Sequence, residues 1–238
     1  MHPNILIAHM AVPNWFLMVG AGAVITVALA VYCVPKDFAL KRPEMAFLSV
    51  LLVGAGLLGA RILFNILHGG SRKGGFAYFG ALALSLITLW VYSAVRRKIK
   101  FLELADYGAP FLFLSQVFVR IGCLMSGCCY GKPTHSSYGV IFKSVDKVLR
   151  HPTQAYEAML LLVIYITGRA IYSKKEKRPG DVLFTTLFLY GAGRFFIEFL
   201  RVDSPVIFFN LTLAQISCLA LALAALIAAL SIKPSKSS

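Results

Sequence analysis

Residues 14–34 read NWFLMVGAGAVITVALAVYCV and contain no charged side chain. About 20 consecutive apolar residues suffice for a helix to cross the hydrocarbon core of a bilayer. Comparable stretches follow along the chain, at about residues 45–64, 76–95, 104–121, 155–173, 181–200 and 213–232. The sequence therefore predicts an all-α polytopic membrane protein of about seven transmembrane helices, which form a single integral membrane domain over residues 1–238.

The composition agrees with this fold class, because 58% of the residues are hydrophobic and only 14% are charged. The formal net charge of +14 could indicate nucleic-acid binding, but the Lys and Arg residues stand in short clusters between apolar stretches, as in membrane proteins. We therefore expect no nucleic-acid partner. The segment before residue 14 has no Lys or Arg and so lacks the basic flank of a cleaved signal peptide, which predicts that the first stretch remains as a span.

The distribution of basic residues predicts how the chain is oriented. Thirteen Lys and Arg residues fall in the connections and tail on one side of the predicted membrane, and seven fall on the other side. Cytoplasmic connections carry the excess of positive charge in membrane proteins. We expect the N-terminus outside and the C-terminus in the cytoplasm, with the longest connection, about 122–154, in a small extracytoplasmic loop region.

Three arginines lie within predicted spans near their outer ends: Arg61, Arg120 and Arg194. An ionisable group at membrane depth is costly and is usually functional. Each arginine could instead extend separately to the lipid headgroups. If they share a pocket, its ligand would be an anion such as a lipid phosphate, which a guanidinium can bind through two parallel hydrogen bonds.

Near the end of the sixth stretch, Tyr190, Arg194 and Glu198 have the spacing i, i+4, i+8, so they share one face of a helix. Arg201 is three residues beyond Glu198 and can also reach it. The pattern predicts either a structural ion pair that joins two spans or an anion site, in which Glu198 holds Arg194 and Tyr190 adds a hydroxyl group.

Arg120 is predicted to end the fourth span, and residues 122–131, GCLMSGCCYG, follow it. Gly122 and Gly131 would let the backbone approach a ligand closely. The cysteines at 123, 128 and 129 leave three alternatives open: a disulfide, a reactive thiolate beside Arg120, or a zinc site. The zinc alternative has the least support because C-x4-C-C is not a usual zinc spacing. We expect no metal and no cofactor.

The fifth stretch opens with the block His151-Pro-Thr-Gln154-Ala-Tyr156-Glu157. Gln154 and Glu157 are one helical turn apart, so both can face the same cleft. His151 is predicted either to act as a base or to cap the helix.

Together these blocks resemble the prolipoprotein diacylglyceryl transferase family. The resemblance runs in family order over most of the chain, in the segments Ala60–Phe64, Ala105–Pro110, Arg120–Gly131, His151–Glu157 and Tyr190–Arg201. It implies a membrane transferase that moves diacylglycerol from phosphatidylglycerol to the cysteine thiol of a prolipoprotein lipobox. It also implies a multi-pass protein of the bacterial inner membrane, with its active site facing the outer leaflet. The expected partners are an anionic phospholipid and a prolipoprotein signal peptide, and we expect a monomer.

From the motifs and this resemblance we expect two groups of site residues. The first group has catalytic roles: Arg120, Arg194, His151, Cys128, Cys129 and Tyr190. The second group contacts the substrate: Arg61, Tyr78, Gly122, Gly131, Gln154, Glu157 and Glu198.

The sequence departs from the family at positions that handle protons and hydrogen bonds. In the family signature Arg-x-Gly-Asn-x-x-Asn-Gly-Glu-x-x-Gly, Cys123 and Ser126 replace the asparagines and Cys128 replaces the glutamate. Phe79 stands where the family has an essential histidine in a His-Gly-Gly block. The chain is therefore identified as a divergent member.

Three functional hypotheses follow. The first is a diacylglyceryl transferase of the standard kind, in which Tyr78 or His151 replaces the lost histidine. The second is a divergent lipid transferase with another acceptor, in which Cys128 or Cys129 is a nucleophile and forms a covalent lipid intermediate. The third is a non-catalytic protein that binds or transports an anionic lipid.

Overall fold

The structure is a computed structural model, and it describes residues 4–7, 10–68, 77–142, 145–202, 206–208 and 210–231. The chain divides into two compact units, which are described separately below. Unit 1 comprises residues 1–24 and 109–238, and unit 2 comprises residues 25–108.

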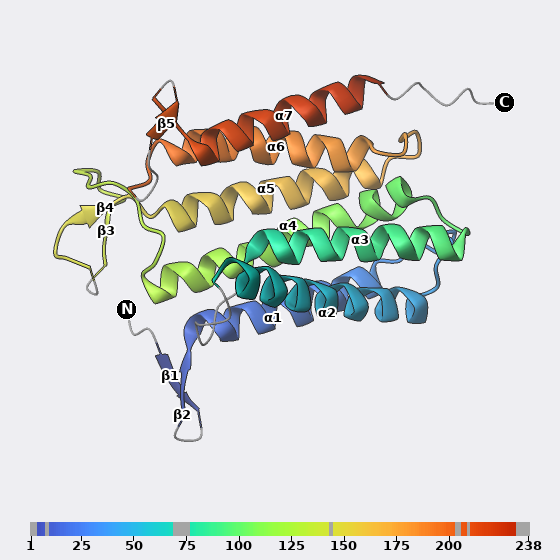
Figure 1. Cartoon of the computed structure of the whole chain (residues 1–238), viewed down its shortest axis with the longest axis horizontal. Coiled ribbons are helices and arrows are strands. Elements are labelled where there is room, and N and C mark those ends of the chain that lie inside the picture. Colours follow the sequence, from blue (N-terminus) through green and yellow to red (C-terminus); the bar gives the residue numbers. More distant parts are fainter. Residues whose placement is uncertain are drawn as a thin grey trace. The chain divides into compact units, whose positions relative to one another are not determined.

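Seven helices form within the described residues, and each coincides with one of the predicted apolar stretches (Figure 1). They are α1 (Asn14–Tyr32), α2 (Arg42–Leu67), α3 (Tyr78–Arg96), α4 (Phe101–Ser126), α5 (Thr153–Tyr172), α6 (Asp181–Glu198) and α7 (Leu213–Ser231). Six of them are long and apolar enough to cross a membrane. The exception is α6, because Asp181, Arg194 and Glu198 all fall within its 18 residues. The predicted all-α, multi-pass membrane fold is confirmed, whereas the predicted orientation stays a prediction.

The strands among the described residues form short antiparallel pairs outside the helices. The pairs are β1 (Asn4–Ile7) with β2 (Met10–Pro13), β3 (Val140–Ile141) with β4 (Leu149–Arg150), and β5 (Val206–Phe208) with β6 (Leu211–Thr212). The second pair lies in the long connection that precedes α5, and the third pair leads into α7.

Helix α4 is longer than the fourth predicted span and continues past Arg120, so where that span ends stays a prediction. The helix continues through Gly122 and ends at Ser126. A Cβ atom on Gly122 would lie 3.0 Å from the Cβ atom of Met18, so the glycine is needed where α4 packs against the first part of α1. The chain leaves the helix at Gly127, which has a left-handed φ of 70°.

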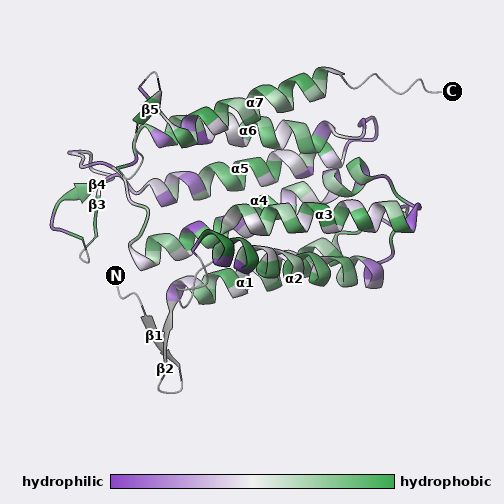
Figure 2. Ribbon diagram, in the orientation of Figure 1, coloured by the Kyte–Doolittle hydropathy of each residue, from purple (hydrophilic) through white to green (hydrophobic). Residues whose placement is uncertain are grey.

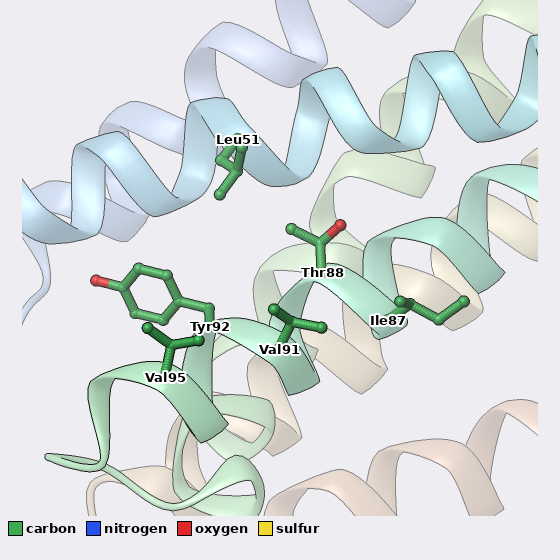
Figure 3. Close-up of a pocket in the computed structure, with 6 residues that line it drawn as sticks. All are labelled: Leu51, Ile87, Thr88, Val91, Tyr92 and Val95. Atoms are coloured by element: carbon green, nitrogen blue, oxygen red, sulfur yellow. The ribbon is translucent and has the colours of Figure 1, made fainter.

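In unit 2, α2 and α3 approach each other through two glycines. A Cβ atom on Gly59 would lie 2.2 Å from the carbonyl oxygen of Gly80, and a Cβ atom on Gly80 would lie 2.2 Å from the carbonyl oxygen of Gly59. Small residues at such a crossing bring two membrane helices into backbone contact. A groove between the same helices is lined by Leu51, Ile87, Thr88, Val91, Tyr92 and Val95 (Figure 3). The Thr88 hydroxyl donates to its own helix, at the carbonyl of Leu84, so the groove is largely apolar.

In unit 1, α5, α6 and α7 lie side by side, with α6 packed against both neighbours (Figure 1). Phe113, Val117, Leu161 and Ile164 form a buried cluster between α4 and α5. Figure 2 shows that hydrophilic residues interrupt the otherwise hydrophobic α6 near its β5 end. Arg194 and Glu198 are buried residues of α6, so the packing of unit 1 encloses a charged site.

Candidate active site

Arginines and glutamates from α4, α5, α6 and the segment after α6 form one continuous chain of ion pairs in unit 1. Nη2 of Arg120 lies 2.9 Å from Oε1 of Glu157, which lies 3.6 Å from Nε of Arg194. Nη1 of Arg194 lies 2.5 Å from Oε2 of Glu198, and Nε of Arg201 lies 3.7 Å from that same oxygen. Each glutamate therefore stands between two arginines, and each contributes one oxygen atom to both.

The arginines of this chain are more exposed than its glutamates. The side chains of Glu157 and Glu198 are 2% and 1% exposed, whereas those of Arg120 and Arg194 are 21% and 11% exposed. Three guanidiniums against two carboxylates leave one net positive charge. Buried carboxylates thus hold a set of partly exposed guanidiniums, and this arrangement suits the binding of an anion.

The end of α6 and the start of α7 fix the position of Glu198. The Thr212 hydroxyl donates to Oε1 of Glu198 at 3.5 Å. Thr212 is itself held by Gln215, because the Thr212 amide donates to Oε1 of Gln215 at 2.9 Å and the Gln215 amide donates to Oγ1 of Thr212 at 3.1 Å. This reciprocal cap at the start of α7 orients the hydroxyl toward the carboxylate.

The segment after α4 folds back sharply toward α5. Cys129 has a positive φ of 61°, two residues after the left-handed Gly127. The Gln154 amide group donates to the carbonyl of Cys128 at 2.5 Å, and the Thr153 hydroxyl donates to the carbonyl of Cys129 at 2.8 Å. The first turn of α5 therefore fixes the backbone of both cysteines.

The fold brings the sulfur atoms of Cys123, Cys128 and Cys129 together, with all three within 4.8 Å of one another. Cys123 is buried, Cys129 is half-buried, Cys128 is exposed, and all three are free thiols in this structure. Hydrogen bonds from Cys123 and Cys128, and then the charges of Arg201 and Arg120, lower the pKa of Cys129. The thiol cluster therefore lies beside the arginine–glutamate chain.

Backbone pairing holds His151 and Gly131 next to this segment. The Gly131 amide donates to the carbonyl of His151 at 2.9 Å, and Gly131 also pairs with Arg201. A Cβ atom on Gly131 would lie 2.6 Å from the carbonyl oxygen of Leu200. Gly131 and Gly122 thus both have a structural reason to be glycine, and their predicted contact with substrate stays a prediction. The His151 ring lies 3.3 Å from the Tyr156 hydroxyl, measured from Nδ1.

The structure places the other expected site residues as follows. Tyr190 packs its ring against Phe113, 5.7 Å away between ring centroids, within the same unit as Arg194. Arg61 lies in α2 of unit 2 and is partly buried. Tyr78 is the first residue of α3, and its side chain lies outside the described part of the chain. Residues 74–76, which belong to the stretch matched to the family's histidine block, also lie outside it.

Thr153 and Thr212 contribute to the site but were absent from the predicted set of site residues, as were Arg201 and Cys123, which the motifs had singled out. Thr153 holds the carbonyl of Cys129, and Thr212 contacts Glu198. A signal for Thr153 was present in the sequence, because it belongs to the block that opens with His151. For Thr212 no motif gave a signal, since its role depends on how α7 packs against α6.

Comparison with known proteins shows which family the chain resembles. The family model for prolipoprotein diacylglyceryl transferase matches residues 4–231. The phosphatidylglycerol–prolipoprotein diacylglyceryl transferase of Clostridium tetani is 31% identical over 77% of this chain and 81% of its own length. The similarly named transferase 2 of Clostridium perfringens is 34% identical over 65% of this chain and 66% of its own. The transferase of Dehalococcoides mccartyi strain 195 is 27% identical over 90% of this chain and 86% of its own.

Proposed function

Because this chain belongs to the prolipoprotein diacylglyceryl transferase family, we propose that it transfers the diacylglyceryl group of phosphatidylglycerol to the cysteine thiol of a prolipoprotein. Its relatives carry this donor and this acceptor in their names. The activity belongs at the outer leaflet of the bacterial inner membrane, a placement that rests on the predicted orientation of the helices. The prolipoprotein signal peptide is the protein partner, and the enzyme acts as a monomer.

The observation that carries the proposal is the alternating chain from Arg120 through Glu157, Arg194 and Glu198 to Arg201. Its net positive charge and partly exposed guanidiniums suit a single phosphodiester anion. The Nε atom of Arg120 has no hydrogen-bond partner among the described residues, although it is buried. In the proposed complex this atom and the neighbouring guanidinium of Arg194 face the phosphate.

The same charges support the chemical step. The acceptor thiolate attacks the glyceryl carbon that bears the phosphate, so a carbon–sulfur bond forms and the carbon–oxygen bond breaks. The electron pair leaves with the oxygen of glycerol phosphate, whose negative charge grows during the step. Guanidiniums already held in place by buried carboxylates stabilise that developing charge without having to reorganise. Arg120 and Arg194 are therefore the residues we assign to leaving-group stabilisation.

The two other hypotheses have less support. A cysteine nucleophile of the protein itself and a lipid carrier without catalysis would each require a function other than the one named for the relatives. The thiol cluster is better explained by a role toward the acceptor.

The proposal is tested in a bacterial host whose own transferase is depleted and which carries this chain on a plasmid. We expect the unaltered chain to restore lipidation of a reporter prolipoprotein, measured by mass spectrometry, and Arg194→Ala to abolish it. Arg169→Ala is the matched control, because the Arg169 guanidinium lies over the rings of Phe111 and Tyr172 and outside the ion-pair chain. Full lipidation with Arg194→Ala, at equal amounts of protein in the membrane, would overturn the assignment.

A further inference from the structure

We propose that Cys123, Cys128 and Cys129 bind a divalent thiophilic metal ion such as Zn²⁺, and that the open fourth coordination position takes the acceptor cysteine of the prolipoprotein. The inference rests on the proposed function for the identity of that acceptor. The metal site itself follows from residues that the structure brings together.

The spacing of the three sulfur atoms fits such a site. They lie within 4.8 Å of one another. A zinc–sulfur bond of about 2.3 Å in tetrahedral geometry places two sulfur ligands about 3.8 Å apart. Closing the cluster around an ion therefore requires any two sulfur atoms to approach by no more than about 1 Å.

The backbone is already arranged to present these thiols. Cys123 is fixed in the last turns of α4, and the Cys128 amide donates to its carbonyl at 3.1 Å. The carbonyls of Cys128 and Cys129 are held from the first turn of α5 by Gln154 and Thr153. These bonds use the backbone carbonyls, whereas the Cys128 thiol donates to the carbonyl of Cys123 at 3.6 Å, a bond that an ion would replace.

The number of ligands indicates an open site. Within the part of the chain that the structure describes, the group contains these three cysteines and no His, Asp or Glu. Structural zinc sites are closed by four protein ligands, whereas catalytic sites keep three and leave a position for water or substrate. Cys128 is exposed, so the cluster is open on one side. An incoming thiol can therefore reach the fourth position.

Charge balance favours a divalent ion. Three thiolates around a divalent ion carry one net negative charge, which nearby guanidiniums stabilise. Arg120 interacts electrostatically with Cys123 and Cys129, and Arg201 interacts electrostatically with Cys129. A monovalent ion would leave two negative charges on the three sulfur atoms before the acceptor binds.

The ion would supply what the reaction needs on the acceptor side. A thiol that coordinates such an ion loses its proton, which passes to water. The bound sulfur then attacks the glyceryl carbon, and glycerol phosphate leaves with the electron pair of the broken carbon–oxygen bond. No oxidant or reductant takes part. Coordination would replace a protein base, for which the sequence offers a reason, because Phe79 is expected to stand where the family has its histidine.

The test begins with the metal content of the full-length protein, purified in detergent without chelator and measured by mass spectrometry of the elements. We expect one divalent metal ion per chain in the unaltered protein and in the control Cys33→Ser, whose thiol lies at the end of α1. We expect loss of the ion in Cys123→Ser, Cys128→Ser and Cys129→Ser. Alkylation tests the same point on the unaltered protein. We expect the three thiols to be protected from alkylation until a chelator removes the metal ion. Metal-free protein whose three thiols are freely alkylated, or two of them joined in a disulfide, would overturn the inference.

A second measurement examines the open position. The protein is loaded with Co²⁺, whose thiolate charge-transfer absorption reports each sulfur ligand, and is mixed with a lipobox peptide or its Cys→Ser analogue. We expect the absorption to rise with the cysteine peptide alone. An unchanged spectrum contradicts acceptor binding. If fully metal-free protein still transfers the lipid, the metal inference is wrong but the proposed function is supported. If the Co²⁺ absorption responds to the cysteine peptide but no lipid is transferred, the metal site is supported and the proposed function is contradicted.

Discussion

Oε1 of Glu157 lies 2.9 Å from Nη2 of Arg120, so a nearly buried carboxylate of α5 is joined to a guanidinium of α4. The same oxygen also faces Arg194 of α6 at 3.6 Å. One buried negative charge therefore sets the distance between the two arginines that we assign to the lipid phosphate. The function of the site depends on this carboxylate as much as on the arginines.

Replacing Glu157 with Gln tests that dependence. The change leaves the guanidiniums of Arg120 and Arg194 without their shared carboxylate, and breaking a buried ion pair costs about 3 kcal/mol. We expect a clearly lower thermal unfolding midpoint in detergent and a loss of transfer activity. The exposed Glu176→Gln is the matched control and should leave both unchanged. Equal unfolding midpoints for Glu157→Gln and the unaltered protein would contradict the role given to this carboxylate.

Arg194→Lys tests whether a positive charge at this position is sufficient for transfer activity. Lysine keeps the positive charge but presents a single ammonium group, so it cannot face Glu157 and Glu198 together while also binding a phosphate. The loss of one charge-assisted hydrogen bond costs about 2 kcal/mol, which corresponds to about a 30-fold decrease in kcat/KM. Steady-state kinetics with phosphatidylglycerol vesicles measure the effect. Activity within twofold of that of Arg169→Lys would show that the fork geometry of Arg194 is not needed.

The sequence predicts part of this site well. The i, i+4 spacing of Arg194 and Glu198 predicts their ion pair, and the structure confirms it. The spacing also brings Arg201 to Glu198. Local periodicity fixes such pairs because both partners lie on or next to one helix. The contact of Glu157 with Arg120 is different, since it depends on the rotation of α4 and α5 about their axes, which spacing within one helix does not determine.

The fold and the thiol cluster, too, could be predicted from the sequence only in part. Apolar stretches predict all seven helices among the described residues, but they do not predict that α4 continues past Arg120 to Ser126. Cys123 therefore lies in a helix, and the left-handed residues Gly127 and Cys129 turn the chain back toward it. The linear spacing of the cysteines argued against a zinc site, because spacing alone does not show that the backbone reverses.

Thr153→Val tests the support that α5 gives to the cysteines. The change removes the hydrogen bond to the carbonyl of Cys129 at nearly constant volume, and it should cost about 1 kcal/mol. We expect faster alkylation of Cys129 in chelator-treated protein, because its backbone is less constrained. Thr88→Val is the control, since the Thr88 hydroxyl bonds within its own helix. The same alkylation rate in both variants would show that Thr153 does not position the cluster.

Gly59→Ala tests the packing of unit 2 independently of the chemistry. The new methyl group would meet the carbonyl oxygen of Gly80, and the strain should cost about 1–3 kcal/mol. Gly54 lies in the same helix with no atom within 4 Å of a Cβ position, so Gly54→Ala should be tolerated. Thermal unfolding in detergent distinguishes the two. A midpoint for Gly59→Ala equal to that for Gly54→Ala would mean that the glycines do not form the crossing.

The most direct test of the central claim is transfer by purified protein with defined substrates. The reaction contains a lipobox peptide and vesicles of either phosphatidylglycerol or phosphatidylethanolamine, and mass spectrometry records the peptide. We predict that a diacylglyceryl group appears on the peptide cysteine with phosphatidylglycerol, and that Arg194→Ala removes it while Arg169→Ala does not. A peptide that stays unmodified with the unaltered protein, or that is modified equally by Arg194→Ala, would contradict the account.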